Sequence, residues 1–267
     1  MLLAIDSGNT NVVFAVFSDV GELLGEWRAG TEQNKTDDEF GIWLTQLIEQ
    51  DGINRKDITS AILATVVPDN LIHLKSLCLK YFDCDALVIG DPNLDLGLNI
   101  LIDNPTEVGA DRLCNAVAAH DSYEGPVLIL DFGTATTFDV IDQIGNYCGG
   151  AIFPGINLSL EALHHGAAKL PRIAIDKPEL VIGKDTVSAM RSGIFWGHVS
   201  MIEGMVTRIS EEFGYSMKVI ATGGLAELFH NSCEAVNICD STLTLRGLLK
   251  IAQTNQNLVR SNGHSGT

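Results

Sequence analysis

Two short segments of this sequence carry residue types that could hold a phosphate group. They are Asp6-Ser7-Gly8-Asn9-Thr10-Asn11 and Asp131-Phe132-Gly133-Thr134-Ala135-Thr136-Thr137. Each begins with a carboxylate that could hold phosphate through a metal ion or water, followed by a glycine that lets backbone N–H groups approach a ligand. The Thr and Asn side chains that follow add hydrogen-bond donors. Because the two aspartates lie about half a chain apart, we expect two facing half-sites that together form a nucleotide cleft.

The residues around each segment predict a strand, a tight turn and a second strand. Apolar runs precede the aspartates, at Leu3-Ala4-Ile5 and Ile129-Leu130, and others follow the turns, at Val12 to Phe17 and Phe138 to Ile141. An Asp-x-Gly turn is also ordinary hairpin chemistry, so a single copy would indicate only a structural turn. Two copies half a chain apart favour a ligand site.

Further along each half, apolar spacing predicts strands that alternate with helices. We expect one helix after Thr36, a second after Pro68 with Asp69 as its cap, and a long helix from Thr186 to Phe213 that Thr186 would cap. The other expected elements are strands at 23–27, 61–67, 86–89 and 218–221, and helices through 113–117, at 157–165 and from about 241.

Each half therefore starts with antiparallel strands and continues with β–α units, which predicts an α/β fold. That order is similar to the duplicated ribonuclease-H-like domains of the acetate/sugar kinase, Hsp70 and actin group. We expect one such domain at residues 1–120, a second at 121–254, and a polar, disordered tail at 255–267.

The composition narrows the classes of partner. The chain of 267 residues is 46% hydrophobic, enough for two domains with cores, and its net charge of −17 argues against nucleic acid and anionic membranes as partners. Its six cysteines include no Cys-x-x-Cys pair and predict buried free thiols in a reducing compartment rather than a zinc site. Without a signal-peptide pattern or a run of ~18 apolar residues, the protein is expected to be soluble and cytoplasmic.

Two segments look like signatures of other kinases but lack the residues that accompany them there. Asp131-Phe132-Gly133 matches the metal motif of protein kinases, yet the sequence has no Gly-rich loop and no His-Arg-Asp loop. Gly183-Lys184-Asp185-Thr186 matches only the end of a Walker A loop, because Pro178 stands where the first glycine belongs. We therefore expect neither a protein kinase nor a P-loop enzyme.

The remaining motifs, taken in order, closely resemble those of the type III pantothenate kinases, a family that includes the Bvg accessory factor homologues. Besides the two aspartate segments, they are Gly109-Ala110-Asp111-Arg112, Gly149 to Gly155, Leu170-Pro171, Ile182 to Thr186 and Ala221 to Gly224. The resemblance covers nearly the whole chain. It implies a phosphotransferase with an alcohol acceptor, which uses ATP with Mg²⁺ to convert pantothenate to 4′-phosphopantothenate, the first step of coenzyme A biosynthesis.

The resemblance also implies a role for individual residues. Asp111 would accept the proton of the pantothenate hydroxyl, and Asp131 would bind a monovalent cation, K⁺ or NH₄⁺. The pantothenate pocket would be completed across a homodimer interface and would contain Gly109, Ala110, Asp111, Arg112 and Thr186. The ATP site would contain Asp6, Ser7, Gly8, Asn9, Thr10, Asn11, Val12, Val13 and Thr134.

The chemistry of Asp111 and Arg112 suits these roles. A helix N-terminus and the neighbouring guanidinium both favour the ionised carboxylate of Asp111. Such a carboxylate is a weak base, but it can orient the hydroxyl and accept its proton late in phosphoryl transfer. The fork of Arg112 suits the carboxylate of pantothenate or a phosphate. Taken alone, however, the pair would indicate an ordinary surface Asp-Arg at a helix start.

One position departs from the family pattern. Members usually have a Tyr that contacts pantothenate seven residues before the Gly of Gly-x-Asp-Arg, and this chain has Ile102 there. Losing one such hydrogen bond costs ~0.5–1.5 kcal/mol, so we expect weaker substrate affinity or a compensating contact, not loss of function. Two other functions stay open at this point: a non-catalytic nucleotide-binding regulator, and a kinase for another small hydroxy acid or sugar.

Overall fold

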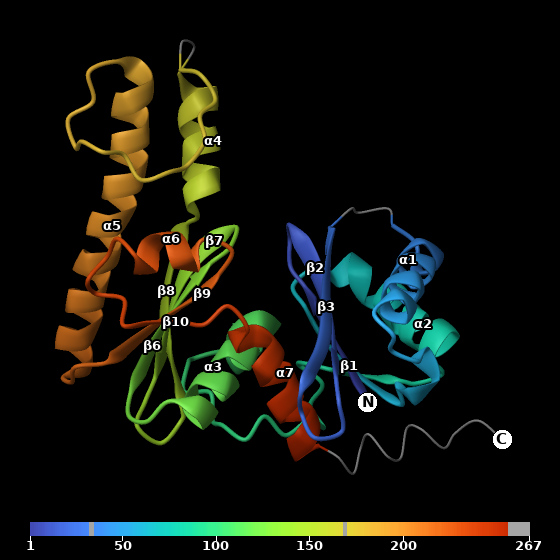
Figure 1. Cartoon of the computed structure of the whole chain (residues 1–267). Helices are drawn as coiled ribbons and strands as arrows, with labels where there is room; N and C mark the ends of the chain where they lie inside the picture. The colour runs from blue at the N-terminus through green and yellow to red at the C-terminus, as the bar shows by residue number, and fades with distance from the viewer. Residues whose placement is uncertain (32–34, 168–169, 256–267) are drawn as a thin grey trace. The chain divides into compact units, whose positions relative to one another are not determined.

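The computed structural model of the protein describes residues 1–31, 35–167 and 170–255 (Figure 1). The chain divides into two compact units. Unit 1 runs over Met1–Asn99, Asp103–Ala118 and Leu243–Thr267, and unit 2 runs over Ile100–Ile102 and Ala119–Thr242. Of the tail expected to be disordered, residues 256–267 lie outside the described residues.

Unit 1 is built on a five-stranded sheet in the order β3-β2-β1-β4-β5. The strands β1 (Leu2–Ser7), β2 (Asn11–Phe17) and β3 (Leu23–Gly30) pair antiparallel, as their apolar runs and short turns predict. The strands β4 (Ser60–Thr65) and β5 (Ala86–Val88) continue the sheet in parallel on the other side of β1. The carboxyl ends of β1 and β4 therefore meet at one edge of the sheet.

Unit 2 repeats this topology. The strands β6 (Val127–Phe132), β7 (Ala135–Ile141) and β8 (Tyr147–Pro154) form the antiparallel part. The strands β9 (Lys218–Gly223) and β10 (Ile238–Cys239) follow in parallel on the other side of β6. The order β8-β7-β6-β9-β10 is that of the first sheet, strand for strand, which confirms the α/β class and the duplication expected from the repeated motif.

The helices of unit 1 cover both faces of its sheet (Figure 1). The helices α1 (Asp37–Gln50) and α2 (Pro68–Phe82) pack on one face, where Leu3, Ile5 and Phe14 meet Phe40 and Leu74. The last helix, α7 (Leu243–Thr254), packs against β1 and β4. The sequence placed α7 with the second half, whereas its contacts place it in unit 1. The domain boundaries expected from the sequence, at 1–120 and 121–254, stay a prediction.

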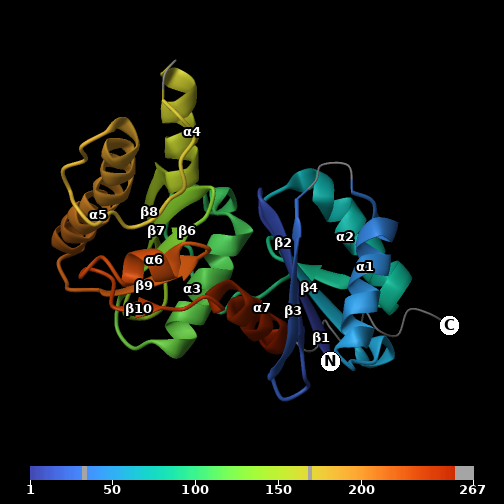
Figure 2. The same ribbon diagram turned by 45° about the horizontal axis from the view of Figure 1, so that its top comes forward.

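Unit 2 has its helices α4 (Ile156–Gly166), α5 (Thr186–Phe213) and α6 (Ala226–His230) after the antiparallel strands (Figure 2). Phe195 of α5 and Phe229 of α6 pack against Leu130 and Phe138 of the sheet. In both views α4 and the first part of α5 extend beyond the sheet. No helix in the described part of the chain is both long and apolar enough to cross a membrane.

Two helix starts differ from the sequence prediction. Asp69 does not cap α2, because the helix begins at Pro68, whose fixed φ and missing N–H suit the first helical position. Thr186 does not cap α5, because Asp185 takes that place and accepts a hydrogen bond from the backbone N–H of Ser188 at 2.9 Å. Thr186 is instead the first helical residue, so its side chain has no capping role.

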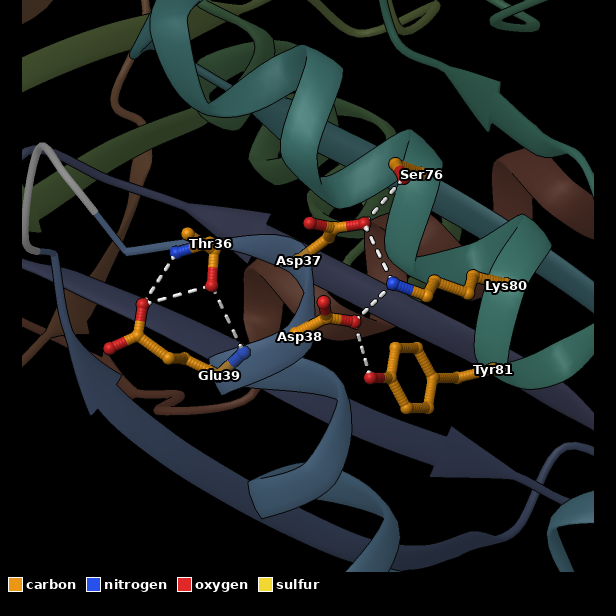
Figure 3. Close-up of polar contacts among 7 residues, drawn as sticks. All are labelled: Thr36, Asp37, Asp38, Glu39, Ser76, Lys80 and Tyr81. Atoms are coloured by element: carbon orange, nitrogen blue, oxygen red, sulfur yellow. Dashed lines mark hydrogen bonds and ion pairs between the residues drawn. The ribbon is translucent and has the colours of Figure 1, made fainter.

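Polar contacts join the start of α1 to the last two turns of α2 (Figure 3). The Asp38 carboxylate accepts a hydrogen bond from the Tyr81 hydroxyl at 2.6 Å and also pairs with Lys80. Both partners hold the pKa of Asp38 below its usual value, Lys80 more than Tyr81. The Ser76 hydroxyl donates to the Asp37 carboxylate at 2.7 Å. These contacts hold the start of α1 against α2.

Candidate active site

The turn between β1 and β2 is held at both ends by backbone and side-chain hydrogen bonds. The Gly8 N–H donates to the Asn11 carbonyl at 2.9 Å and closes the turn. Thr31 fixes it from the neighbouring strand end, because its N–H donates to the Thr10 carbonyl at 2.9 Å and its hydroxyl to the Gly8 carbonyl at 2.7 Å. Asn9 lies exposed at the tip of this turn. A turn held in this way presents preformed polar groups to a ligand.

The predicted ATP residues of unit 1 do not all face outward. The side chains of Ser7, Val12 and Val13 are buried, whereas Asn9 and Thr10 are exposed. The remaining predicted residues, Asp6, Gly8 and Asn11, are half-buried. Ser7, Val12 and Val13 therefore shape the turn from inside, and the residues from Gly8 to Asn11 form its accessible part.

Ser7 connects this turn to the start of α2. Its hydroxyl accepts a hydrogen bond from the Asn70 amide at 3.2 Å, and both residues are buried. Its carbonyl accepts a hydrogen bond from the Val66 N–H at 3.1 Å, just beyond the end of β4. The segment that follows β4 is thus bonded to the end of β1.

The segment Gly109-Ala110-Asp111-Arg112 reaches the same edge of the sheet. The helix α3 (Ala110–Ser122) begins here, and the Asp111 carboxylate accepts a hydrogen bond from the backbone N–H of Arg112 at 2.8 Å. A Cβ placed on Gly109 would lie 2.7 Å from Asp111 Oδ1 and 3.6 Å from Val66 Cγ1. Since the Val66 N–H also bonds the Ser7 carbonyl, the end of β1 and the segment of Asp111 lie at one edge of unit 1.

Cys114 gives a second indication that Asp6 and Asp111 lie near one another. It is fully buried one helical turn after Asp111. Burial raises the pKa of its thiol well above the usual value, and the charges of Asp6 and Asp111 raise it further. Both carboxylates therefore act on the same thiol, which stays protonated and unreactive.

In unit 2, Asp131 stands at the end of β6 before a turn that is one residue shorter. The Gly133 N–H donates to the Ala135 carbonyl at 3.0 Å, and the Gly155 N–H donates to the Thr134 carbonyl at 3.0 Å. Gly133 and Thr134 are exposed. The second copy of the motif therefore also presents a polar turn, as expected.

The end of the neighbouring strand, β9, lies very close to the Asp131 carboxylate. Gly223, at the end of β9, has φ +88°, and a Cβ there would lie only 2.5 Å from Asp131 Oδ1. Only glycine allows β9 to approach the carboxylate so closely. Thr222 on β9 and Thr137 on β7 are the register partners of Asp131. A carboxylate flanked by two hydroxyl residues offers oxygen donors, which fits the expected cation.

The sequence prediction missed a buried polar cluster beside Asp131. The Asp139 carboxylate is 0% exposed and accepts hydrogen bonds from the Tyr147 hydroxyl at 2.7 Å and the Thr137 hydroxyl at 3.0 Å. The signal was present in Phe138-Asp139-Val140, where a charged residue interrupts an apolar strand. Among the described residues, no group of three or more His, Cys, Asp or Glu side chains could hold a metal ion.

Ile102, which stands where the family usually has Tyr, and the predicted substrate residue Thr186 lie in unit 2. Ile102 follows Leu101, whose N–H donates to the Tyr147 carbonyl at 2.8 Å, and its Cγ2 atom lies 3.4 Å from the position of a Cβ on Gly149. Thr186 is exposed at the start of α5. Unit 1 thus carries Asp6 to Val13 and Gly109 to Arg112, and unit 2 carries the remaining predicted residues.

Comparison with known proteins identifies relatives over nearly the whole chain. The family model for type III pantothenate kinase matches residues 2–208. The type III pantothenate kinase of Paramagnetospirillum magneticum is 63% identical over 260 residues, which cover 97% of this chain and 100% of that protein. The type III pantothenate kinase of Rhodospirillum rubrum is 59% identical over 256 residues, covering 96% of this chain and 99% of that protein.

A solved structure shares the fold at low identity. Component A of the (R)-2-hydroxyglutaryl-CoA dehydratase of Acidaminococcus fermentans is 14% identical, with a TM-score of 0.55 over 97% of this chain and 98% of that chain. This likeness concerns the fold alone. It agrees with the duplicated, actin-like α/β architecture that the two equivalent sheets display.

Proposed function

The chain belongs to the type III pantothenate kinase family, and from this we propose a function for it and a role for each part of the site. The protein phosphorylates pantothenate with ATP, the first step of coenzyme A biosynthesis. The observation that supports the assignment of residues is made at one edge of unit 1, where the Val66 N–H bonds Ser7 at the end of β1 and the Val66 side chain lies beside Gly109. Phosphoryl transfer requires that a phosphate and an acceptor hydroxyl meet, and this edge holds groups suited to both.

The ATP phosphates contact the turn from Asp6 to Val13, chiefly its accessible residues Gly8 to Asn11. Their backbone N–H groups and side chains can donate to phosphate oxygens, and Thr31 keeps the turn in place beforehand. As a kinase, the protein uses ATP together with a divalent metal ion, which neutralises phosphate charge when it is bound. In unit 2, Thr134 offers its exposed side chain and backbone to the nucleotide.

Asp111 is the proton acceptor, and Gly109, Ala110 and Arg112 bind pantothenate around it. The N–H of Arg112 donates to the Asp111 carboxylate at 2.8 Å, which orients that carboxylate at the start of α3. An oriented carboxylate can bind the pantothenate hydroxyl and take its proton as the new P–O bond forms. The Arg112 guanidinium suits the carboxylate of pantothenate. A regulator without turnover would not need this carboxylate, and the family assignment favours pantothenate over other acids or sugars.

Asp131 binds a monovalent cation, and Thr186 contacts substrate in a pocket shared by two subunits of a homodimer. A fixed apolar surface near Thr186 supports the dimer. The exposed side chains there are Leu158, Leu163, Leu180, Val181, Ile182 and Val187. Leu158 and Leu163 lie on α4 and Val187 on α5, and the segment of the other three is held to α5 by a hydrogen bond from the Ser192 hydroxyl to the Val181 carbonyl. The six free thiols suit a reducing compartment, and we place the enzyme in the cytoplasm.

The test is ADP formation from ATP and Mg²⁺, with and without pantothenate, in K⁺ and then in Na⁺ buffer of equal ionic strength. Pantothenate-dependent ADP formation in the wild-type protein is the expected result. A higher rate in K⁺ than in Na⁺ would support the cation site. ATP binding without any stimulation by pantothenate would contradict the function and point to another acceptor or to a regulator.

A further inference from the structure

The two aspartate half-sites occupy equivalent positions but have different neighbours. In unit 1, the register partners of Asp6 are Val13 on β2 and Ala64 on β4, both apolar. In unit 2, the corresponding partners of Asp131 are Thr137 on β7 and Thr222 on β9. Because the two sheets share one topology, this difference belongs to the sites and not to the fold. The second half-site therefore has hydroxyl residues on both neighbouring strands, opposite its carboxylate.

Asp139 lies two residues beyond Thr137 on the same face of β7. Its register partner is Ile129, and the residue at the equivalent place in unit 1 is Ala15, opposite Ala4. In the first copy, a small apolar residue at this position is therefore sufficient to form the strand. In the second copy the strand carries a fully buried carboxylate, which is costly unless it is hydrogen-bonded. The equivalence with Ala15 argues against a purely structural reason for Asp139.

The hydrogen bonds of Asp139 determine what the Thr137 hydroxyl can do. Tyr147, 1% exposed, donates to Asp139 Oδ1 at 2.7 Å, and Thr137 donates to Asp139 Oδ2 at 3.0 Å. A threonine hydroxyl has one proton and two lone pairs. Because its proton points at Asp139, the Thr137 oxygen has only lone pairs left for other partners. Directly opposite side chains in a sheet have Cβ atoms about 4.5–5.5 Å apart, so the Thr137 side chain stands opposite that of Asp131.

We propose that the Thr137 hydroxyl oxygen is a second ligand of the monovalent cation held by Asp131, and that Asp139 and Tyr147 are positioning residues that fix its direction. The proposal rests on the proposed function, in which Asp131 binds that cation. A carboxylate and an oxygen that can only accept suit K⁺, and also NH₄⁺, which needs acceptors. The register partners of Asp6 are instead Val13 and Ala64, so the arrangement proposed for Asp131 belongs to the second half-site.

The test compares Thr137→Val with wild type in two measurements. The first is the rise in melting temperature with KCl, at ionic strength held constant with choline chloride, which needs no turnover. The second is the K⁺ concentration that gives half-maximal ADP formation. We expect Thr137→Val to shift both responses to about tenfold higher K⁺, and Thr137→Ser to restore them. The matched control is Thr45→Val in α1, whose buried hydroxyl has no partner among the described residues.

Tyr147→Phe tests the positioning role without touching the cation. It removes one donor to Asp139 and keeps the ring, so we expect a K⁺ response between those of wild type and Thr137→Val, with the maximal rate at saturating K⁺ retained. An unchanged K⁺ response in Thr137→Val, or a wild-type protein without one in either measurement, would overturn the proposal. A wild-type protein that binds K⁺ but ignores pantothenate would contradict the proposed function alone.

Discussion

Among single residues, Asp111 is the one on which turnover should depend most directly. Asp111→Asn keeps the size of the side chain and its acceptor for the Arg112 N–H but removes the proton acceptor. We expect ATP affinity to stay near wild type and kcat to fall about 10²- to 10⁴-fold. Titration calorimetry and a steady-state ADP assay measure the two effects.

The control for this substitution is Asp57→Asn, an exposed Asp in the short helix Arg55–Asp57 of the same unit. It changes the same charge at the opposite end of β1, where the Asp57 carbonyl accepts a hydrogen bond from the N-terminus of Met1, so kcat should not change. A rate close to wild type in Asp111→Asn would exclude Asp111 as the base.

Ile102 is the second residue with a measurable role in substrate affinity. Its side chain packs near Gly149 on the edge strand of unit 2, and it has no group that can hydrogen-bond. Ile102→Tyr would supply a phenol where the family usually has one. The KM for pantothenate should therefore fall by a factor of about 2–10, which is the contribution of one hydrogen bond. The KM for ATP serves as internal control. An unchanged or higher pantothenate KM would show that another contact already replaces the phenol.

Some residues of the site could be predicted from the sequence, and others could not. The two turns were recognisable because the required chemistry is local: an apolar run, an Asp, a Gly and short polar side chains. The pairing of Thr137 with Asp131 was not recognisable, because it depends on the turn between β6 and β7, which is one residue shorter than the turn between β1 and β2. Asp139 and Tyr147 meet through a strand register with an irregularity, which no local pattern encodes.

At the scale of elements, the contact between α1 and α2 depends on a glycine. A Cβ on Gly41 would lie 2.3 Å from the Tyr81 ring, whose hydroxyl bonds Asp38 at 2.6 Å. Gly41→Ala should push the ring aside, break that bond and reduce the free energy of unfolding by about 1–3 kcal/mol. Urea denaturation measures the change, and Tyr81→Ser in the same chain should lessen it.

Gly197 in α5 provides the matched control for this substitution. It is an exposed helical glycine with no atom within 4 Å of an added Cβ. Gly197→Ala should therefore stabilise the protein by ~0.5–1 kcal/mol through helix propensity alone. Equal effects of the two substitutions would show that the Tyr81 contact does not limit the packing of α1 on α2.

Helices and strands with strong local signals were predicted well, and those defined by distant contacts were not. The span of α5 follows from its apolar spacing and matches Thr186–Phe213, although the cap is Asp185. The two-residue strand β10 has too few residues for a pattern, and it exists because it pairs with β9. Asn255 was assigned to the tail, yet it is buried and its amide donates to the Asp95 carbonyl at 2.7 Å.

At the scale of the whole molecule, the duplication was visible in the sequence, but the place of the last helix was not. Both sheets repeat one strand order, as the two Asp-x-Gly motifs implied. The helix α7 packs in unit 1, where Gly247 lies so close to Cys114 that an added Cβ would stand 2.0 Å from its carbonyl oxygen. That contact joins residues far apart in the chain, and amphipathic spacing shows only that α7 has an apolar face, not which sheet it covers.

The proposed homodimer is the hypothesis about the whole molecule that most needs a test. Ile182 is 72% exposed on the segment before Thr186, so Ile182→Glu should leave the fold of a subunit intact but place a charge within an apolar interface. Sedimentation velocity should show a dimer for wild type and a shift to monomer for the variant, with a higher pantothenate KM if the pocket spans two subunits. Ile144→Glu, at a residue 76% exposed in the same unit, adds the same charge away from that surface and should stay dimeric and active. A dimeric Ile182→Glu variant would move the interface elsewhere, and a monomer with full activity would show that one subunit completes the site.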